Sequence, residues 1–313
     1  MIKRTLYFGN PAYLSTSNEQ LVIKLPEVEA NDSLPEFFKK EMVRSVPIED
    51  IGVVVLDDRR ITITHGVLDK LLANNCAVIT CDASHMPAGL LLPLDGNSIQ
   101  NERFRQQLES SLPLRKQLWQ QTIQYKIRNQ AAVLHKTRGQ TVKNMMVWAN
   151  EVKSGDSENK EAQAAAYYWR NLFPMIENFS RGRDGVAPNA LLNYGYAILR
   201  AVVARALVGS GLLPTLGIHH HNRYNAYCLA DDVMEPYRPY VDELVIKVFE
   251  KYGCGCEELT KEIKAELLII PMIDVVINGK RSPLMIGVSQ TTASLQKCFA
   301  GELRKISYPE IEM

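Results

Sequence analysis

The sequence predicts an α+β fold, with a small β-rich N-terminal domain (residues 1–98) followed by a larger all-α C-terminal domain (residues 99–313). Two observations predict it. The first hundred residues contain short segments rich in Val, Ile, Leu and Thr between turn-prone residues, which is typical of strands. After residue 100, apolar residues recur at helical spacing instead. The polar segment 94–100 separates the two patterns, and we expect the domain boundary there.

The N-terminal domain is predicted to contain mainly strands. One short helix is expected at 65–74, where Val67, Leu68, Leu71 and Leu72 are spaced as on one helix face. The charged segment 57–60 reads as a hairpin loop between two strands. Strands are predicted at 4–8, 20–24, 51–56, 61–64, 77–80 and 88–93.

The C-terminal domain is predicted to contain mainly helices. A break is expected at Pro113, because proline cannot continue a helix from within. A strand at 275–277, followed by Asn278-Gly279, suggests a tight turn. Helices are predicted at 103–112, 114–135, 142–153, 160–173, 189–208, about 229–252 and 282–299.

Composition excludes several classes of protein. Of 313 residues, 46% are hydrophobic and 23% charged, which excludes a disordered, collagen-like or fibrous chain. No apolar run of about 18 residues stands out as a membrane span, and the N-terminus lacks a signal-peptide core. Without an export signal, the six cysteines read as reduced thiols. We therefore expect a cytoplasmic protein that does not enter a membrane, and we read Cys254-Gly255-Cys256 as a loop.

The net charge of +1 hides a local asymmetry. Residues 101–150 contain nine Lys or Arg and two acids, interleaved with aromatic residues and Gln, a pattern that suits a phosphate backbone. A solvated helix face is the alternative. Residues 229–268 contain ten acids and five bases, a pattern that could pair with the basic stretch or hold a metal.

Glu161 is the first acid in an unusual place. It opens a predicted helix, and the positions four, seven and eleven residues later are Ala165, Tyr168 and Leu172. Glu161 therefore lies at the edge of an apolar stripe. A buried carboxylate needs a partner or a metal ion. The alternative is that Glu161 only caps the helix, where its negative charge stabilises the N-terminus.

A second group of acids lies near residue 235. Asp231 and Asp232 are four and three residues before Glu235, so a helix would place them close together. Like charges at this spacing repel unless a cation lies between them. The alternative is a set of surface acids at a helix start, where Pro236 would restrict the backbone.

Three consecutive histidines, His219, His220 and His221, cannot all converge on one ion in an extended chain. Neither a four-ligand zinc pattern nor an HExxH motif is present. One imidazole combined with carboxylates favours Mg²⁺ or Mn²⁺, and the imidazole tilts the choice toward Mn²⁺.

Several blocks in order along the whole chain carry a family resemblance: RTLYFGNPAYLSTSNEQLVIK, ITITHGVLDKLLANNCAVITCDASHMPAG, EAQAAAYYW, NALLNYGYAILRA, GLLPTLGIHHH and LADDVMEPYRP. Together they resemble the CRISPR-associated integrase, the universal adaptation endonuclease, in the style of type II systems. The resemblance implies that a 3′-hydroxyl of incoming DNA attacks a phosphodiester at the boundary of a CRISPR repeat, in antiviral defence.

The resemblance also implies the site. Glu161, His220 and Glu235 would be the catalytic ligands of Mg²⁺ or Mn²⁺, and His219 or His221 replaces His220 if the loop register differs. Some relatives carry Asp in place of Glu235, and many carry Gly in place of Ala162. Asp232, as a second acid near the metal, and Asn193 would support the ligands. Arg170, Arg181, Arg183, Arg200 and Arg223 are the expected phosphate contacts.

The resemblance further implies a homodimer formed largely through the N-terminal domains. Two such dimers, bridged by a dimer of a small ferredoxin-like CRISPR-associated partner, would form a heterohexamer on double-stranded protospacer and repeat DNA. Two other functions stay open. One is a Mn²⁺-dependent nuclease acting on branched DNA or nucleotides without integration, and the other is a non-catalytic scaffold that bridges DNA ends.

Overall fold

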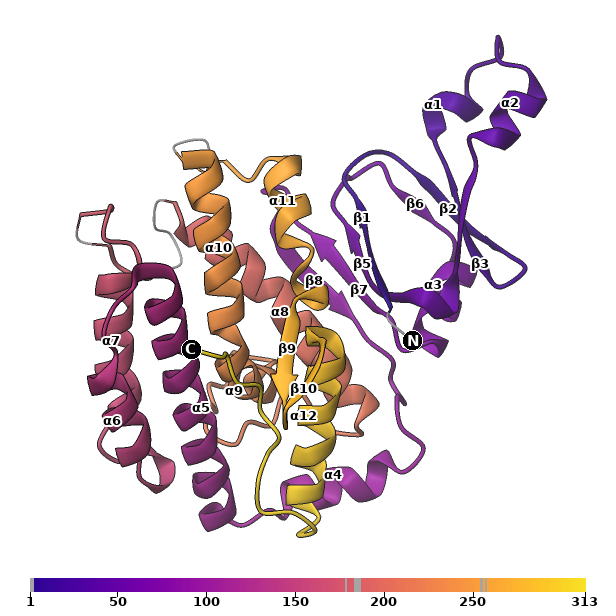
Figure 1. Ribbon diagram of the computed structural model, residues 1–313. Helices are drawn as coiled ribbons and strands as arrows, with labels where there is room; N and C mark the ends of the chain where they lie inside the picture. Colours follow the sequence, from indigo (N-terminus) through magenta and orange to yellow (C-terminus); the bar gives the residue numbers. More distant parts are fainter. Residues whose placement is uncertain (1–2, 178, 183–186, 254–255, 257) are drawn as a thin grey trace. The chain divides into compact units, whose positions relative to one another are not determined.

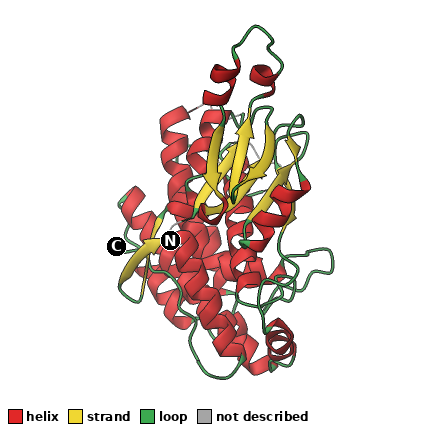
Figure 2. Cartoon of the chain, turned by 90° about the vertical axis from the view of Figure 1, so that its right-hand side faces the viewer, coloured by secondary structure: helices red, strands yellow, loops and turns green. Residues whose placement is uncertain are grey.

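The computed structural model describes residues 3–177, 179–182, 187–253, 256 and 258–313. The chain forms two compact units, residues 1–94 and 95–313. The division expected after residue 98 differs from this boundary by four residues. Strands are concentrated in the first unit and helices in the second (Figure 2). Arg183 and Cys254 lie outside the described residues.

The N-terminal unit contains two four-stranded sheets. In one, with strand order β1-β5-β7-β8, the first three strands are parallel and β8 is antiparallel; the other has the order β4-β3-β2-β6. The strands are β1 (Arg4–Phe8), β2 (Tyr13–Ser17), β3 (Gln20–Lys24), β4 (Arg44–Pro47), β5 (Ile51–Leu56), β6 (Thr62–Ile63), β7 (Ala77–Cys81) and β8 (Pro87–Leu91); the helices are α1 (Pro26–Glu29), α2 (Glu36–Glu41) and α3 (His65–Ala73).

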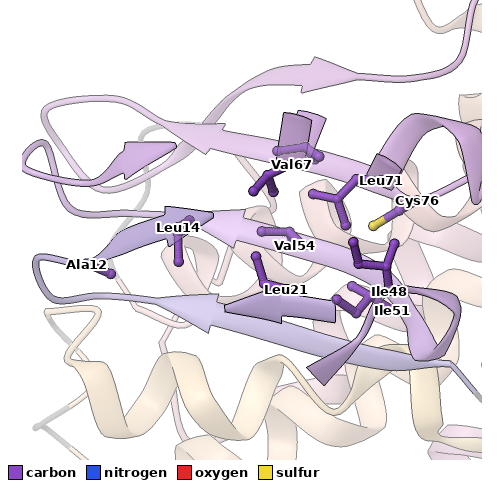
Figure 3. Packing of buried hydrophobic residues seen from close by; sticks show 10 residues of the cluster. Ala12, Leu14, Leu21, Ile48, Ile51, Val54, Val67, Leu71 and Cys76 are labelled. Atoms are coloured by element: carbon purple, nitrogen blue, oxygen red, sulfur yellow. The ribbon is translucent and has the colours of Figure 1, made fainter. Parts of the chain in front are cut away.

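The core of this unit is apolar (Figure 3). Leu14 and Leu21 come from one sheet and Val54 from the other, while Val67 and Leu71 come from α3. Each of these side chains is at most 1% exposed. Burial of such side chains is the main stabilising contribution to the unit, at roughly 1.5–3 kcal/mol for each one.

Two expectations for the N-terminal unit were wrong. Residues 57–60 do not form a hairpin loop, because β5 and β6 belong to different sheets and β6 pairs in parallel with β2. Strand β2 was missed because its sequence, YLSTS, is largely polar. It is fixed instead by a hairpin with β3, whose two turn residues, Asn18 and Glu19, have φ of 48° and 58°. That backbone is the one that a two-residue hairpin turn requires. Strand β4 and helices α1 and α2 were also missed.

The helical unit is organised around α5 (Leu112–Arg138), which packs against α6, α7 and α10 (Figure 1). Pro113 does not break this helix but lies in its first turn, where a missing amide hydrogen costs nothing. The Ser111 side chain accepts the amide of Leu114, and Gly139, with φ of 62°, ends the helix. The other helices are α4 (Gln100–Leu108), α6 (Lys143–Glu151), α7 (Lys160–Leu172), α8 (Asn189–Gly209), α9 (Cys228–Met234), α10 (Arg238–Tyr252), α11 (Lys261–Leu267) and α12 (Leu284–Phe299).

The helical unit is not all-α, because β9 (Asp274–Ile277) pairs with β10 (Lys280–Pro283). Asn278 and Gly279 make the expected tight turn, with φ of 51° and 74°. The segment predicted as one helix from about 229 to 252 is divided: the 3-10 turn η3 (Glu235–Tyr237) joins α9 to α10 at Pro236. Helix α11 was missed.

Helix α8 is long and apolar enough to cross a membrane by composition, although no such run was expected from the sequence. In the structure 78% of its most apolar stretch is buried within the protein, as in the core helix of a folded domain. The cysteines that the structure describes are all free thiols, as expected: Cys76, Cys81, Cys228, Cys256 and Cys298.

Candidate metal centre

Glu161 does not cap its helix. The carboxylate of Asp156 accepts the backbone amides of Lys160 and Glu161 at 2.9 and 3.0 Å and so caps the first turn of α7. The Glu161 side chain is left to reach Lys126, whose Nζ donates to its Oε1 at 2.6 Å. Asp156 therefore supplies the side-chain cap, while Glu161 stays in the first turn of α7 with a buried partner, Lys126.

Glu235 lies in η3 and is 3% exposed. Its Oε1 is 3.1 Å from Arg238 Nη2, and its Oε2 is 2.6 Å from Lys126 Nζ. Although burial raises the pKa of this carboxyl, Arg238 and Lys126 hold it below its ordinary value, so Glu235 is ionised. Oε2 is therefore a buried oxygen whose charge is balanced by the ammonium of Lys126.

Lys126 therefore joins two acids from separate parts of the chain. Burial lowers the pKa of its ammonium, but Glu235 and Glu161 more than offset this effect and raise it. From the sequence, Lys126 is treated only as one of the basic residues of 101–150, and its contact with the two acids is not predicted. A sharper signal was present, because Lys126 lies at helical spacing from the apolar residues Trp119 and Ile123.

His220 is held by Asp232, which is fully buried. Asp232 accepts the backbone amides of His219 and His220 at 2.9 and 3.2 Å, and its Oδ1 is 2.5 Å from Nδ1 of the His220 ring. This hydrogen bond raises the pKa of His220, while burial opposes the rise. Gly217 makes the tight loop possible, since a Cβ there would lie 2.2 Å from the His220 carbonyl oxygen.

The three histidines have three different surroundings. The ring of His219 stacks on buried Trp119, with centroids 4.1 Å apart, and burial lowers its pKa. The ring of His220 meets Trp119 edge-on at 5.6 Å, and it interacts electrostatically with Glu235 and Glu161. His221 is exposed, and its Nδ1 is 2.6 Å from the carbonyl oxygen of His219. The choice of His220 as ligand stays a prediction.

Asp231, Asp232 and Glu235 do not share one cation, although their spacing suggested this. Asp231 pairs with Arg200 at 2.7 Å and accepts from Asn225 at 2.7 Å, whereas Asp232 faces the histidine loop. Repulsion is relieved because each carboxylate has its own partners. Arg200, expected to contact DNA, is therefore engaged within the protein.

The remaining predicted residues divide into paired and exposed ones. Arg181 donates to Asn189 and Asn193 at 3.1 and 2.7 Å, and its guanidinium lies over the ring of Tyr196. Tyr196 also lies beneath Arg238, so this network extends to Glu235. Arg170 and Arg223 are exposed.

Fewer of the basic residues in 101–150 are free to contact DNA than the charge of this stretch suggests. Six of its nine bases bond within the protein: Arg103, Arg115, Lys126, Arg128, Lys136 and Arg138. Arg105, Lys116 and Lys143 are exposed. These three, with Arg170 and Arg223, are the stronger candidates for phosphate contacts.

A cavity of 470 Å³ adjoins the histidine loop. His220 and His221 line it together with Arg115, Arg223 and Tyr224. Tyr224 is 81% exposed and its ring lies under the Arg223 guanidinium, with 4.7 Å between them. A cation and an aromatic face at the edge of a cavity suit a phosphate and a base.

The carboxylate oxygens and the imidazole nitrogen of these residues are atoms of the kinds that bind Mg²⁺ or Mn²⁺. Glu161 and Glu235 converge on one cation, Lys126, and Asp232 engages Nδ1 of His220, so Nε2 is the ring nitrogen that remains for a metal ion. Yet within the part of the chain that the structure describes, no three His, Cys, Asp or Glu side chains already converge closely enough to hold an ion. Two acids are assembled, and the ammonium of Lys126 lies between them.

Comparison with known proteins agrees with this fold and with the sequence resemblance. The family model described as CRISPR associated protein Cas1 matches residues 6–265. A CRISPR-associated endonuclease Cas1 from Neisseria meningitidis serogroup C is 36% identical over 313 residues, covering 99% of this chain and 97% of the relative.

Two solved structures share the fold at low identity. A casposase bound to integration product superposes with a TM-score of 0.76 at 20% identity, covering 100% of this chain and 95% of that one. A chain of a Cas6-RT-Cas1–Cas2 complex superposes with a TM-score of 0.73 at 19% identity, covering 99% of this chain and 36% of that one. The expected α+β architecture is confirmed, and the full-length match to the Neisseria relative shows that the chain belongs to the CRISPR-associated protein Cas1 family.

Proposed function

We propose that this protein is a metal-dependent DNA endonuclease and strand-transfer integrase that inserts short DNA into a CRISPR array. One observation carries the proposal: Glu161 from α7 and Glu235 from η3 converge on one cation beside His220, which Asp232 holds. Family membership supports it, as does the name of the Neisseria relative, an endonuclease. The casposase that shares the fold is bound to an integration product.

Glu161, His220 and Glu235 would hold a Mg²⁺ or Mn²⁺ ion. When bound, such an ion neutralises the oxygens of a phosphodiester and makes a hydroxyl easier to deprotonate. Asp232 keeps Nδ1 of His220 engaged, so Nε2 of the neutral ring would be the nitrogen that binds the ion. Arg238 offsets the charge of Glu235, which reduces the repulsion that a DNA phosphate would otherwise meet.

The DNA would approach along the cavity beside His220. Arg223 and Tyr224 there offer one cation and one exposed ring. The phosphate contacts would position the backbone of the DNA without reading its sequence. The incoming 3′-hydroxyl would then attack a phosphodiester held next to the two carboxylates, and the leaving strand would carry away the 3′-oxygen of the broken bond.

We further propose the assembly. The protein forms a homodimer and joins a small ferredoxin-like CRISPR-associated partner, in the ratio of two homodimers to one partner dimer, on double-stranded DNA. The presence of Cas2 in the Cas6-RT-Cas1–Cas2 complex supports a partner of this kind.

The test is strand transfer of a labelled, 3′-hydroxyl-ended short duplex into a supercoiled plasmid that carries a repeat array. The protein is assayed with and without its small partner, in Mn²⁺, Mg²⁺ or EDTA. Joined product should require a divalent ion and should fall on the order of 100-fold or more in Glu161→Ala, His220→Ala and Glu235→Ala. Glu302→Ala, which changes an exposed acid, is the control and should retain activity.

Other outcomes point elsewhere. Cleavage without joined product, although the partner complex forms, would replace the integrase with a nuclease. DNA binding without either reaction would favour a scaffold. If activity survives in folded His220→Ala but not in the two glutamate variants, the imidazole ligand is His219 or His221.

A further inference from the structure

We propose that Lys126 is a built-in counter-ion that competes with the divalent cation for Glu161 and Glu235, so that metal binding requires the ammonium to leave both carboxylates. The inference rests on the proposed metal site and goes further, because it assigns a role to a residue that is not itself a metal ligand.

The contact geometry is the first argument. Lys126 Nζ is 2.6 Å from Oε1 of Glu161 and 2.6 Å from Oε2 of Glu235. The two acids are 74 residues apart in sequence, and Lys126 comes from a third element, α5. A divalent ion coordinated by the same oxygens would lie about 2.1 Å from each. The ammonium and the ion are therefore alternatives for one position.

Because the site is largely buried, the carboxylates of Glu161 and Glu235 need a positive charge between them. Lys126 is 8% exposed and Glu235 is 3% exposed, and the Glu161 side chain is 26% exposed. Two carboxylates brought together at such a place repel strongly when nothing positive lies between them. Lys126 supplies that charge from inside the fold, so the acids stay close to each other without help from a dissolved ion.

The contact is also built so that it can be released. Lys126 contacts only Oε2 of Glu235, at 2.6 Å, whereas Arg238 pairs with the other oxygen, Oε1, at 3.1 Å. Arg238 therefore keeps Glu235 in place when Lys126 withdraws. Lysine suits the exchange better than arginine, because its ammonium is a compact charge on four flexible methylene groups.

Charge balance explains why the two cations exclude one another. Lys126 and Arg238 together already neutralise Glu161 and Glu235. A divalent ion added beside an unmoved ammonium would leave two like charges within a few ångströms in a poorly solvated place. Lys126 thus lowers the affinity for the metal while it preserves the arrangement of the ligands.

The experiment measures Mn²⁺ binding to the full-length protein without DNA, by titration calorimetry. It compares the wild type with Lys126→Met, which keeps the length of the side chain and removes its charge. Lys136→Met is the matched control, since Lys136 lies on the same helix and pairs with Glu243 at 2.9 Å. Circular dichroism in EDTA checks that each variant is folded.

Lys126→Met should bind Mn²⁺ on the order of tenfold more tightly than the wild type, and its unfolding temperature should rise more on addition of Mn²⁺. Lys136→Met should bind as the wild type does. Equal or weaker binding by folded Lys126→Met would overturn the proposal and make Lys126 a support for the ligands. Failure of both the wild type and folded Lys126→Met to bind Mn²⁺ would overturn the metal site itself, which separates the two failures.

A second measurement uses the unmodified protein in case Lys126→Met does not fold. Lysine side chains are labelled briefly with an amine-reactive reagent, with and without Mn²⁺, and are quantified by mass spectrometry. Release from two carboxylates should speed the labelling of Lys126 severalfold and leave Lys136 unchanged. An unchanged or slower rate at Lys126 would contradict the exchange.

Discussion

Glu235 and Asp242 are buried carboxylates seven residues apart, and the protein holds them in opposite ways. Cations surround Glu235, since Lys126 and Arg238 both contact it. Hydroxyl groups surround Asp242: Tyr168 donates to Oδ2 at 2.8 Å, and Tyr196 donates to Oδ1.

The pKa values follow these surroundings. Burial raises the pKa of Asp242 to about 6 although both tyrosines oppose the rise, whereas the cations keep that of Glu235 below its ordinary value. A carboxylate held by cations stays charged and can exchange one cation for another. Asp242, held by hydroxyls, joins α7, α8 and α10, and Arg238 and Arg181 act on it only electrostatically, without an ion-pair contact. We therefore assign Glu235 to the chemistry and Asp242 to the framework.

The largest expected difference is in activity. Glu235→Gln keeps the size of the side chain and removes its charge, so joined product should fall on the order of 100-fold or more. Asp242→Asn keeps the hydrogen-bonding shape and should change the rate by less than a few fold. Initial rates of strand transfer under identical conditions measure both. Similar losses in the two folded variants would remove the distinction.

Asp242 should make a contribution of its own to the pH dependence of stability. Because its pKa of about 6 in the folded protein exceeds the ordinary 3.8, the folded protein keeps a proton that the unfolded chain has already released. The contribution of Asp242 to the free energy of unfolding should therefore fall as the pH rises from about 4 to about 6, by up to about 3 kcal/mol, and level off above that range.

Urea unfolding at several pH values, with wild type and Asp242→Asn side by side, measures this contribution. The variant lacks the titrating group, so the wild type should lose stability relative to it across that range. A difference that is constant with pH would show that Asp242 has an ordinary pKa.

A smaller effect is expected from one hydroxyl. Tyr168→Phe removes one of the two donors to Asp242 and should lower the free energy of unfolding by about 1–2 kcal/mol at pH 5. Tyr167→Phe changes the neighbouring, partly exposed tyrosine and is the control, with an expected change below about 0.5 kcal/mol. Equal effects in the two variants would argue against a special role for the buried pair.

The smallest effect should come from removing Arg200, the partly exposed partner of Asp231. Arg200 contacts Asp231 at 2.7 Å, but its side chain is 40% exposed. Solvent screens such a pair, so Arg200→Ala should lower stability by less than about 1 kcal/mol, and added salt should shrink the difference further. Thermal unfolding at low and high salt tests this, and a large loss that salt does not change would show that solvent does not screen the Asp231–Arg200 pair.

Much of the fold follows from local sequence. Strands β1, β3 and β5 begin and end where their apolar runs predict, and Asn278-Gly279 turns between β9 and β10 as this dipeptide does in hairpins. Such features depend on side-chain period and on backbone preference over a few residues, and neighbours along the chain decide both. Local reasoning failed at 57–60, where two strands that are close in sequence join different sheets.

In the candidate site too, some features follow from the sequence and others only from the tertiary structure. The sequence by itself marked Glu161, Asp232 and Glu235 as acids in unusual places, and its ordered blocks pointed to the Cas1 family. Only the tertiary structure decided their partners. Lys126 meets Glu161 across 35 residues and Glu235 across 109, and Asp156 takes over the capping role open to Glu161. The physical reason is that charge pairing depends on how α5, α7 and η3 pack, and that packing is set by buried apolar faces distributed over the whole helical unit.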